Sequence, residues 1–211
     1  MDNNQSINQY LKAFYSDGYR IGMGASGKVN SRKILFSAIE EMYRQIDELT
    51  DSVSELANRE KNFIDCKKGC HWCCHQPVFA LNYELDYLKY FIKNTFPIEK
   101  QKKISERART KVKKLQSLHN ENLLNSKHAC PLLENGACIA YKARPMACRI
   151  YLSTNVKSCL KFYNEPYDKN NYPALLDFPM QAGRMMNEGF KSALKTNGFK
   201  PEEFRIEEKL I

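Results

Sequence analysis

The stretch CKKGCHWCCH, residues 66–75, decides how the fold is interpreted, because it places four cysteines within nine residues. Short gaps between Cys66, Cys70 and Cys73 let a backbone turn bring several sulfur atoms toward one point, and Gly69 eases that turn. Zinc ions and iron–sulfur clusters both take thiolate ligands at such spacings. We therefore predict that this loop binds metal.

A second, more widely spaced group of cysteines follows: Cys130, Cys138, Cys148 and Cys159. Residues 132–136, LLENG, predict a small hairpin whose Asn-Gly turn brings Cys130 and Cys138 close together. Two groups of four thiols suit either two four-ligand sites or one multinuclear site with some thiols to spare.

The adjacent Cys73 and Cys74 complicate the choice of ligands. Neighbouring side chains in extended backbone point to opposite sides and rarely bind one small ion together, so one of the pair can serve another site. Three histidines are alternative ligands, and each is otherwise an ordinary surface residue or a partner of a ligand: His71, His75 and His128.

The same loop also has the spacing of a radical-SAM cluster motif, with Trp72 before the third thiol. Radical-SAM enzymes hold that motif after the first strand of a partial β/α barrel. Here we expect a helix before the loop and no repetition of strands and helices after it, so we do not favour this alternative.

The size and the N-terminus of the chain help to decide whether the eight cysteines are reduced thiols or disulfides. A chain of 211 residues can build a core without cross-links. The first 20 residues lack the basic start and apolar stretch of a secretory signal, and no apolar run approaches the roughly 18 residues of a membrane-spanning helix. We expect a cytoplasmic protein with no membrane span, in which thiols stay reduced and serve as metal ligands rather than disulfides.

The spacing of apolar residues predicts a mainly α fold, in which a bundle-like helical scaffold carries irregular cysteine-rich loops that form the metal site. After Ser31, apolar residues recur at alternating gaps of four and three: Leu35, Ile39, Met42, Ile46, Leu49, Val53 and Leu56. We favour the seam of an intramolecular bundle over a coiled-coil dimer contact. Further helices are expected over 7–15, 82–96 with Asn82 as N-cap, 98–124, and 173–196 closed by Asn197-Gly198.

Four glycines lie between the first two predicted helices: Gly18, Gly22, Gly24 and Gly27. The stretch YRIGMGASGKVN (residues 19–30), which begins directly after Gly18, matches no phosphate-binding loop, because Gly27-Lys28 runs into Val29 and no apolar strand precedes it. We interpret it as a flexible linker.

The chain is expected to form a single domain over 1–211. It would consist of an N-terminal helical segment (1–61), a cysteine-cluster core (62–164) and a C-terminal helical segment (165–211). Residues 129–171 show no sustained periodicity, which suggests loops held in place by metal rather than by an apolar core. No alternating β-branched run is long enough to predict a substantial sheet.

The net charge of +9 is concentrated in residues 100–114, where only Glu106 opposes eight basic side chains: Lys100, Lys102, Lys103, Arg107, Arg109, Lys111, Lys113 and Lys114. This segment is a candidate contact for an anionic partner. One alternative function is therefore a nucleic-acid-binding protein stabilised by zinc. Against it, charge runs are usually solvated helix faces, and this one lacks interleaved aromatic residues for stacking.

Taken together, CKKGCHWCC and CPLLENGACIAYKARPMACRIY (residues 130–151) resemble the YkgJ-type cysteine-cluster family, whose domain is named for a CxxCxxCC motif and described as zinc- or iron-chelating. The telling features are Cys-Pro-x-Leu at Cys130, Gly136-x-Cys138, Tyr141, Arg144-Pro145 and Cys148-Arg149. The resemblance implies these ligands: Cys66, Cys70, Cys73, Cys74, Cys130, Cys138 and Cys148, with Cys159 as the eighth. The first gap has three residues instead of two, so this chain departs from the pattern at Cys66.

The accessory arginines of the second motif suggest how the thiols are supported. Arg144 and Arg149 beside thiolates would offset negative charge and favour deprotonation, while Pro145 restrains the backbone before Cys148. Each arginine is otherwise the partner of a surface carboxylate.

The resemblance implies a metal site and little else, because most members of the family have no assigned activity. We expect a metal-binding protein, with iron–sulfur or zinc, in a structural, carrier or electron-transfer role. Flagellin lysine N-methylases carry a similar cysteine domain, so a methylase that uses S-adenosylmethionine (SAM) is an alternative, although nothing in the sequence shows a SAM-binding site. No catalytic set and no oligomeric state can be assigned from the spacing of residues.

Overall fold

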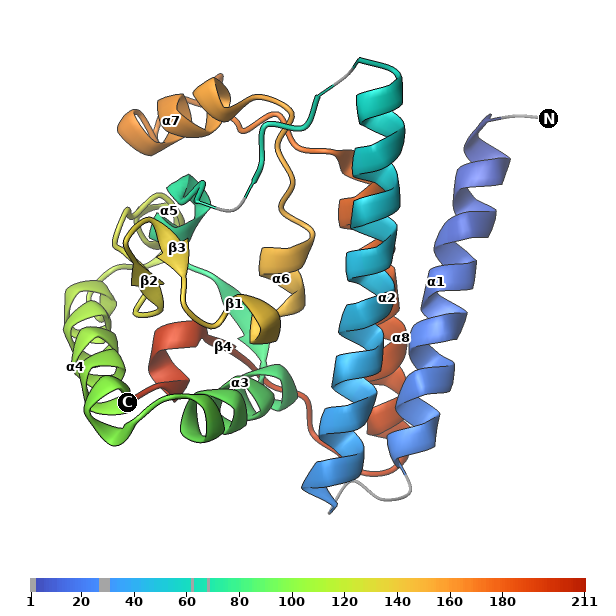
Figure 1. Ribbon diagram of the computed structural model, residues 1–211, viewed down its shortest axis with the longest axis horizontal. Coiled ribbons are helices and arrows are strands. Elements are labelled where there is room, and N and C mark those ends of the chain that lie inside the picture. The colour runs from blue at the N-terminus through green and yellow to red at the C-terminus, as the bar shows by residue number, and fades with distance from the viewer. Residues whose placement is uncertain (1–2, 27–30, 62, 68) are drawn as a thin grey trace. The chain divides into compact units, whose positions relative to one another are not determined.

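The computed structural model describes residues 3–26, 31–61, 63–67 and 69–211, and it confirms a mainly α fold with cysteines in loops and short helices (Figure 1). The chain divides into two compact units. The first contains Met1–Asn62 and Leu176–Glu202, and the second contains Phe63–Leu175 and Glu203–Ile211. The single domain expected from the sequence stays a prediction. Among the described residues, no helix has the length and apolar character needed to cross a membrane.

The first unit consists of three helices that each contact the other two: α1 (Asn3–Ser26), α2 (Arg32–Arg59) and α8 (Asp177–Thr196). Figure 1 shows them side by side. On α2 the predicted apolar stripe is buried within the chain from Leu35 to Ile46, half-buried at Leu49 and Val53, and exposed at Leu56. This burial agrees with the seam of an intramolecular bundle.

The prediction of a flexible linker is wrong for residues 16–26, because α1 runs without a break to Ser26. A Cβ atom at Gly18 would overlap the carbonyl oxygen of Met186, and one at Gly22 would lie 2.8 Å from the Cβ of Ala193. The two glycines therefore let α1 approach α8 closely. Gly27 lies outside the described residues.

The helix α8 begins at Asp177, four residues later than the sequence suggests. The preceding residues are extended: Leu175 pairs with Ser153 in an antiparallel bridge, and the Thr154 N–H donates to the Ala174 carbonyl at 3.0 Å. The predicted end is confirmed, since Gly198 has φ +80° and its N–H bonds back to the helix.

The second unit surrounds the cysteines with short elements. Its helices are α3 (Asn82–Thr95), α4 (Ile98–Leu115), α5 (Asn120–Leu124), α6 (Met146–Arg149) and α7 (Val156–Asn164), with 3₁₀ turns η1 (Trp72–His75), η2 (Tyr141–Ala143) and η3 (Ile206–Lys209). Its strands are β1 (Phe79–Leu81), β2 (Leu133–Glu134), β3 (Ala137–Cys138) and β4 (Glu203–Arg205). Within the described ranges, they form two antiparallel pairs, β1 with β4 and β2 with β3, so the expectation of no substantial sheet is confirmed.

The charged helix predicted over 98–124 is broken in the structure. Its first part, α4, ends at Leu115, and α5 begins at Asn120, whose φ of +51° interrupts the helical path. The α4 helix packs on η3, where Lys111 and Glu207 form a buried ion pair at 3.6 Å. This pair fixes the C-terminal segment beside the cysteine region.

Candidate metal site

The first cysteine loop is a series of tight turns. The N–H of Cys66 donates to the Ser153 carbonyl at 3.1 Å, and its thiol donates to the Tyr151 carbonyl at 3.7 Å. Gly69 has φ +96°, the left-handed conformation that favours glycine. The next turn is η1, in which the Cys74 N–H donates to the His71 carbonyl at 2.9 Å.

The backbone at Cys73 and Cys74 is therefore helical, and the assumption of extended backbone there is wrong. A 3₁₀ helix has three residues per turn, so consecutive side chains leave it about 120° apart. The two thiols are close enough to hydrogen-bond: the Cys74 thiol donates to Cys73, which lowers the pKa of Cys73 and raises the pKa of Cys74.

The predicted hairpin is present, and it lies against this loop. Asn135 and Gly136 both have positive φ, +49° and +75°, as a two-residue type I′ turn requires. Leu133 of β2 pairs with Cys138 of β3. The chain just before the hairpin bonds to η1, because the Cys130 N–H donates to the Cys74 carbonyl at 2.7 Å.

Two short helices supply the remaining cysteines. Cys148 lies in α6, whose first N–H, that of Met146, donates to the buried Glu84 carboxylate at 2.8 Å. Cys159 lies in α7, a helix that sequence periodicity missed. The available signal was Asn155, whose side chain accepts the N–H of Lys157 at 3.0 Å as an N-cap.

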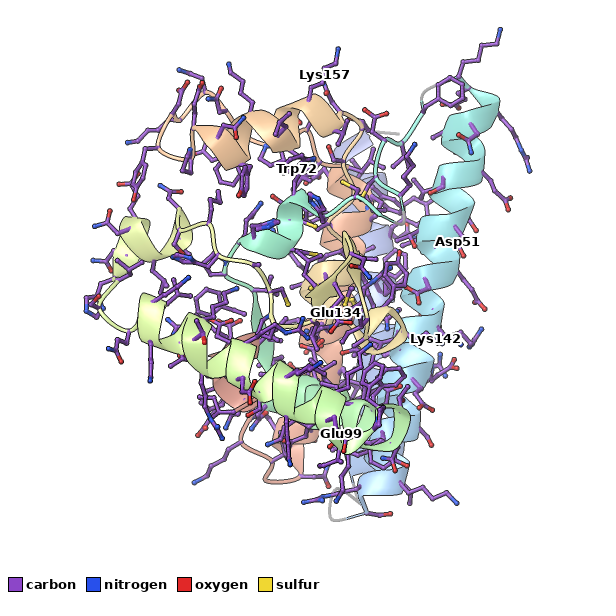
Figure 2. All side chains as sticks on the ribbon, turned by 60° about the vertical axis from the view of Figure 1, so that its left-hand side comes forward. Asp51, Trp72, Glu99, Glu134, Lys142 and Lys157 are labelled. Atoms are coloured by element: carbon purple, nitrogen blue, oxygen red, sulfur yellow. The ribbon has the colours of Figure 1, made fainter. Side chains whose placement is uncertain are left out.

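The α7 helix contacts η1 through aromatic rings. The ring of Tyr163 lies 5.2 Å from that of Trp72 and 5.0 Å from that of His75. Figure 2 shows Trp72 between α7, which carries Lys157, and the hairpin strand that carries Glu134. Glu134 and Tyr163, which lie 62 and 91 positions after Trp72 in sequence, thus belong to segments that surround the first cysteine loop.

All eight cysteines are free thiols, and burial is the largest influence on the pKa values of five of them. It raises the pKa of Cys66 and that of Cys130 to about 11 each. Burial also raises the pKa values of Cys138, Cys148 and Cys159. Such thiols stay protonated near neutral pH unless a bound cation displaces the protons.

Positive charge and backbone N–H groups oppose this effect of burial. The guanidinium of Arg144, which stacks on Tyr141 at 3.7 Å, lowers the pKa values of Cys73, Cys138 and Cys148. The N–H groups of Leu132 and Ala140 donate to the sulfur atoms of Cys130 and Cys138 and lower their pKa values. Lys111 does the same for Cys130.

Arg149 donates hydrogen bonds to the backbone of the neighbouring turn. Its buried side chain donates from Nε to the Arg144 carbonyl at 2.9 Å and from a terminal nitrogen to the Lys142 carbonyl. It therefore fixes the backbone that carries Arg144.

The histidines differ in their surroundings. The Nδ1 atom of His75 lies 3.1 Å from the His71 carbonyl, and burial lowers the pKa values of His75 and His128. The Nδ1 atom of His71 is buried and has no hydrogen-bond partner among the described residues. His71 is thus the best placed of the three as an alternative ligand.

The donor set fits zinc or an iron–sulfur cluster in its chemistry, because it consists of half-buried and buried thiols supported by N–H donors and cations. Within the described residues, no three His, Cys, Asp or Glu side chains yet form a group that could hold one metal ion.

The eight basic side chains of residues 100–114 do not form one free surface. Lys100 and Arg107 bind Glu134 of the hairpin at 3.0 and 2.8 Å. Lys111 is buried against Glu207. The exposed remainder is Lys102, Lys103, Arg109, Lys113 and Lys114.

Comparison with known proteins agrees with this site. The family described as "CxxCxxCC: Putative zinc- or iron-chelating domain" matches residues 65–171, about half of the chain. The matched segment contains all eight cysteines. No curated protein and no solved structure matches the chain.

Proposed function

Because the chain belongs to the CxxCxxCC family, we propose that it is a metal-binding protein whose eight cysteines hold zinc or an iron–sulfur cluster. When bound, the metal would supply either a rigid cross-link between loops or, as an iron–sulfur cluster, a one-electron carrier. The cellular role is then structural, metal-carrying or electron-transferring. A cytoplasmic location stays an expectation.

One observation supports this proposal above all: half-buried and buried thiols from four separate segments lie close enough for the charge of one to raise the pKa of another. Burying so many thiols raises their pKa values and leaves them inert as nucleophiles. A metal ion replaces the protons on these thiols, and the same groups then form a strong metal-binding site. Arg144 and Lys111 then offset the negative charge that several thiolates carry around one metal.

Purification without oxygen, followed by metal analysis and a visible spectrum, tests the proposal. We expect zinc, or iron with inorganic sulfide and a brown colour, bound to protein with few titratable thiols. The matched control is the double variant Cys130→Ala, Cys159→Ala, which should bind much less metal. A reduced wild-type chain that neither carries nor takes up zinc or iron would overturn it.

Two other functions stay predictions. The SAM-dependent methylase requires SAM to bind the metal-loaded protein, and isothermal titration without heat of binding would count against it. The nucleic-acid function depends on residues 100–114, three of whose basic side chains are bound within the second unit. Its test is salt-sensitive binding to mixed DNA and RNA at low salt.

A further inference from the structure

We propose that the buried carboxylate of Glu84 is a positioning residue of the metal site. Glu84 lies outside both groups of cysteines in the sequence. Its side chain nevertheless holds the short helix α6, which carries Cys148, against the start of α3. The inference rests on the proposed function, because a residue can position a ligand only if the thiols bind metal.

Two hydrogen bonds of Glu84 join segments that lie far apart in sequence. One carboxylate oxygen accepts the N–H of Leu81 at 3.2 Å, at the junction of β1 and α3. The other accepts the N–H of Met146, the first residue of α6, at 2.8 Å. The first bond caps α3, as a glutamate at the third helical position commonly does. The second contributes nothing to α3, and it therefore serves the turn that carries Cys148.

The two sides of this connection differ in how firmly they are held. The start of α3 is fixed in the interior, where Tyr83, Leu85 and Glu84 itself are all buried. The α6 helix has only four residues, too few to be stable through its own backbone hydrogen bonds. It therefore takes its position from contacts with the rest of the second unit, among them its packing beside β1 (Figure 1) and the bond to Glu84.

The position of the α6 turn determines where a candidate ligand lies. Met146 is the second residue before Cys148, and the Cys148 N–H donates to the Pro145 carbonyl at 2.9 Å within the same turn. A shift of the Met146 N–H would therefore move the Cys148 backbone with it. Metal sites tolerate little displacement of their ligands, and groups that orient ligands are accordingly important for affinity.

A carboxylate suits this position better than an amide of the same shape. Its two oxygens can each accept one N–H, and both N–H groups are present here. A glutamine has one acceptor oxygen and would turn its NH₂ group toward the other N–H. A buried donor that faces another donor is unfavourable, so the α6 turn should move away from its place in Glu84→Gln.

The first test compares Glu84→Gln with Asp86→Asn, which removes an exposed carboxylate from the same helix. Metal-free protein is reduced and titrated with Zn²⁺ without oxygen, in competition with a chromophoric chelator. We expect Glu84→Gln to bind Zn²⁺ about 10- to 100-fold more weakly than the wild type, and Asp86→Asn to bind it as the wild type does. Equal affinities of all three proteins would overturn the inference.

Alkylation separates positioning from a general loss of structure. Protein saturated with Zn²⁺ is treated with iodoacetamide, and the modified cysteines are followed over time by mass spectrometry. In Glu84→Gln, Cys148 should react faster than in the wild type, whereas Cys159, which lies in the separate helix α7, should react at the wild-type rate. Equal acceleration at both cysteines would show that Glu84 serves only overall stability, which would also overturn the inference.

A second measurement uses the wild type alone, so it does not depend on the folding of a variant. Hydrogen exchange of the Met146 N–H is followed by NMR in metal-free and Zn²⁺-loaded protein. The bond to Glu84 predicts slow exchange, and a role in the metal site predicts that Zn²⁺ slows it further, by at least about 10-fold. Exchange at the rate of an unstructured peptide, or exchange that Zn²⁺ does not change, would overturn the inference. A wild-type chain that takes up no Zn²⁺ would instead contradict the proposed function on which the inference rests.

Discussion

Arg144 is the residue whose positive charge acts on several thiols. Its guanidinium stacks on Tyr141 and lowers the pKa values of three cysteines, and Arg149 holds its carbonyl. The sequence motif suggested that both arginines lie beside thiolates. It could not separate their contacts, because both are adjacent to cysteine-bearing turns, and only the fold shows that Arg149 donates to the carbonyls of Lys142 and Arg144.

Arg144→Gln should weaken zinc binding by roughly 10-fold, a typical effect of losing a group that supports the ligands. The physical reason is that a lost cation raises the pKa values of neighbouring thiols, so the metal must displace more tightly held protons. Competition with a chromophoric chelator at constant pH measures the affinity. The control is Lys142→Gln, which removes an exposed charge from the same turn, and an equal effect of both changes would contradict this role.

Among the secondary-structure elements, α1 shows why a glycine-rich stretch can be misinterpreted. Gly18 and Gly22 are spaced by four residues and lie on the helix face that touches α8, where Gly189 approaches the backbone of α1 at Tyr15. Sequence reasoning treated glycine as a break because it weakens helices. Close packing between helices compensates for that cost here.

Gly18→Ala should lower the free energy of unfolding by about 1–3 kcal/mol, because its Cβ has no room beside Met186. Gly24→Ala is the matched change, since no atom lies within 4 Å of its Cβ position. It should stabilise the helix by about 0.5–1 kcal/mol. Urea unfolding followed by circular dichroism measures both, and equal effects would show that α1 does not pack closely on α8.

The ion pairs of Glu134 attach the hairpin to α4. Hydrogen bonds from Lys100 and Arg107 lower the pKa of Glu134. A carboxyl whose pKa is lower in the folded state stabilises the fold above its unfolded pKa, about 4.3, and loses this effect as the pH falls through the folded value.

Glu134→Gln should therefore cost up to about 1 kcal/mol at pH 7, given the partial exposure of the group. The difference between wild type and variant should shrink toward zero as the pH falls below the folded pKa. Urea unfolding at a series of pH values measures it. Glu106→Gln, an exposed change on α4, is the control, and a difference that grows in acid would be inconsistent with the ion pairs.

For the whole molecule, the sequence predicted the position of the cysteines in irregular loops, the hairpin and the mainly helical class, because these features depend on local spacing. It could not predict which thiols are neighbours. That depends on contacts such as Ser153 with Cys66 and Cys130 with Cys74, which join segments far apart in sequence. Loops without periodicity contain no local signal for such contacts.

Removal of metal should destabilise the protein. The cysteine-bearing loops of the second unit lie between short helices and strands, which hold these loops less firmly than a bound metal would. A ligand at 100 times its dissociation constant adds about 2.7 kcal/mol to the free energy of unfolding. Thermal unfolding with and without a chelator measures the loss, and added Zn²⁺ should restore it. The double variant Cys130→Ala, Cys159→Ala should show a much smaller response, and an equal response would place the bound metal elsewhere.

X-ray absorption at the zinc or iron edge of protein purified without oxygen tests the central claim most directly. Thiolate ligation by the eight cysteines predicts a coordination shell of sulfur atoms, with metal–sulfur distances of about 2.3 Å and about four sulfur atoms per metal. A shell dominated by nitrogen and oxygen, or a protein without metal whose thiols are oxidised in pairs, would contradict the account.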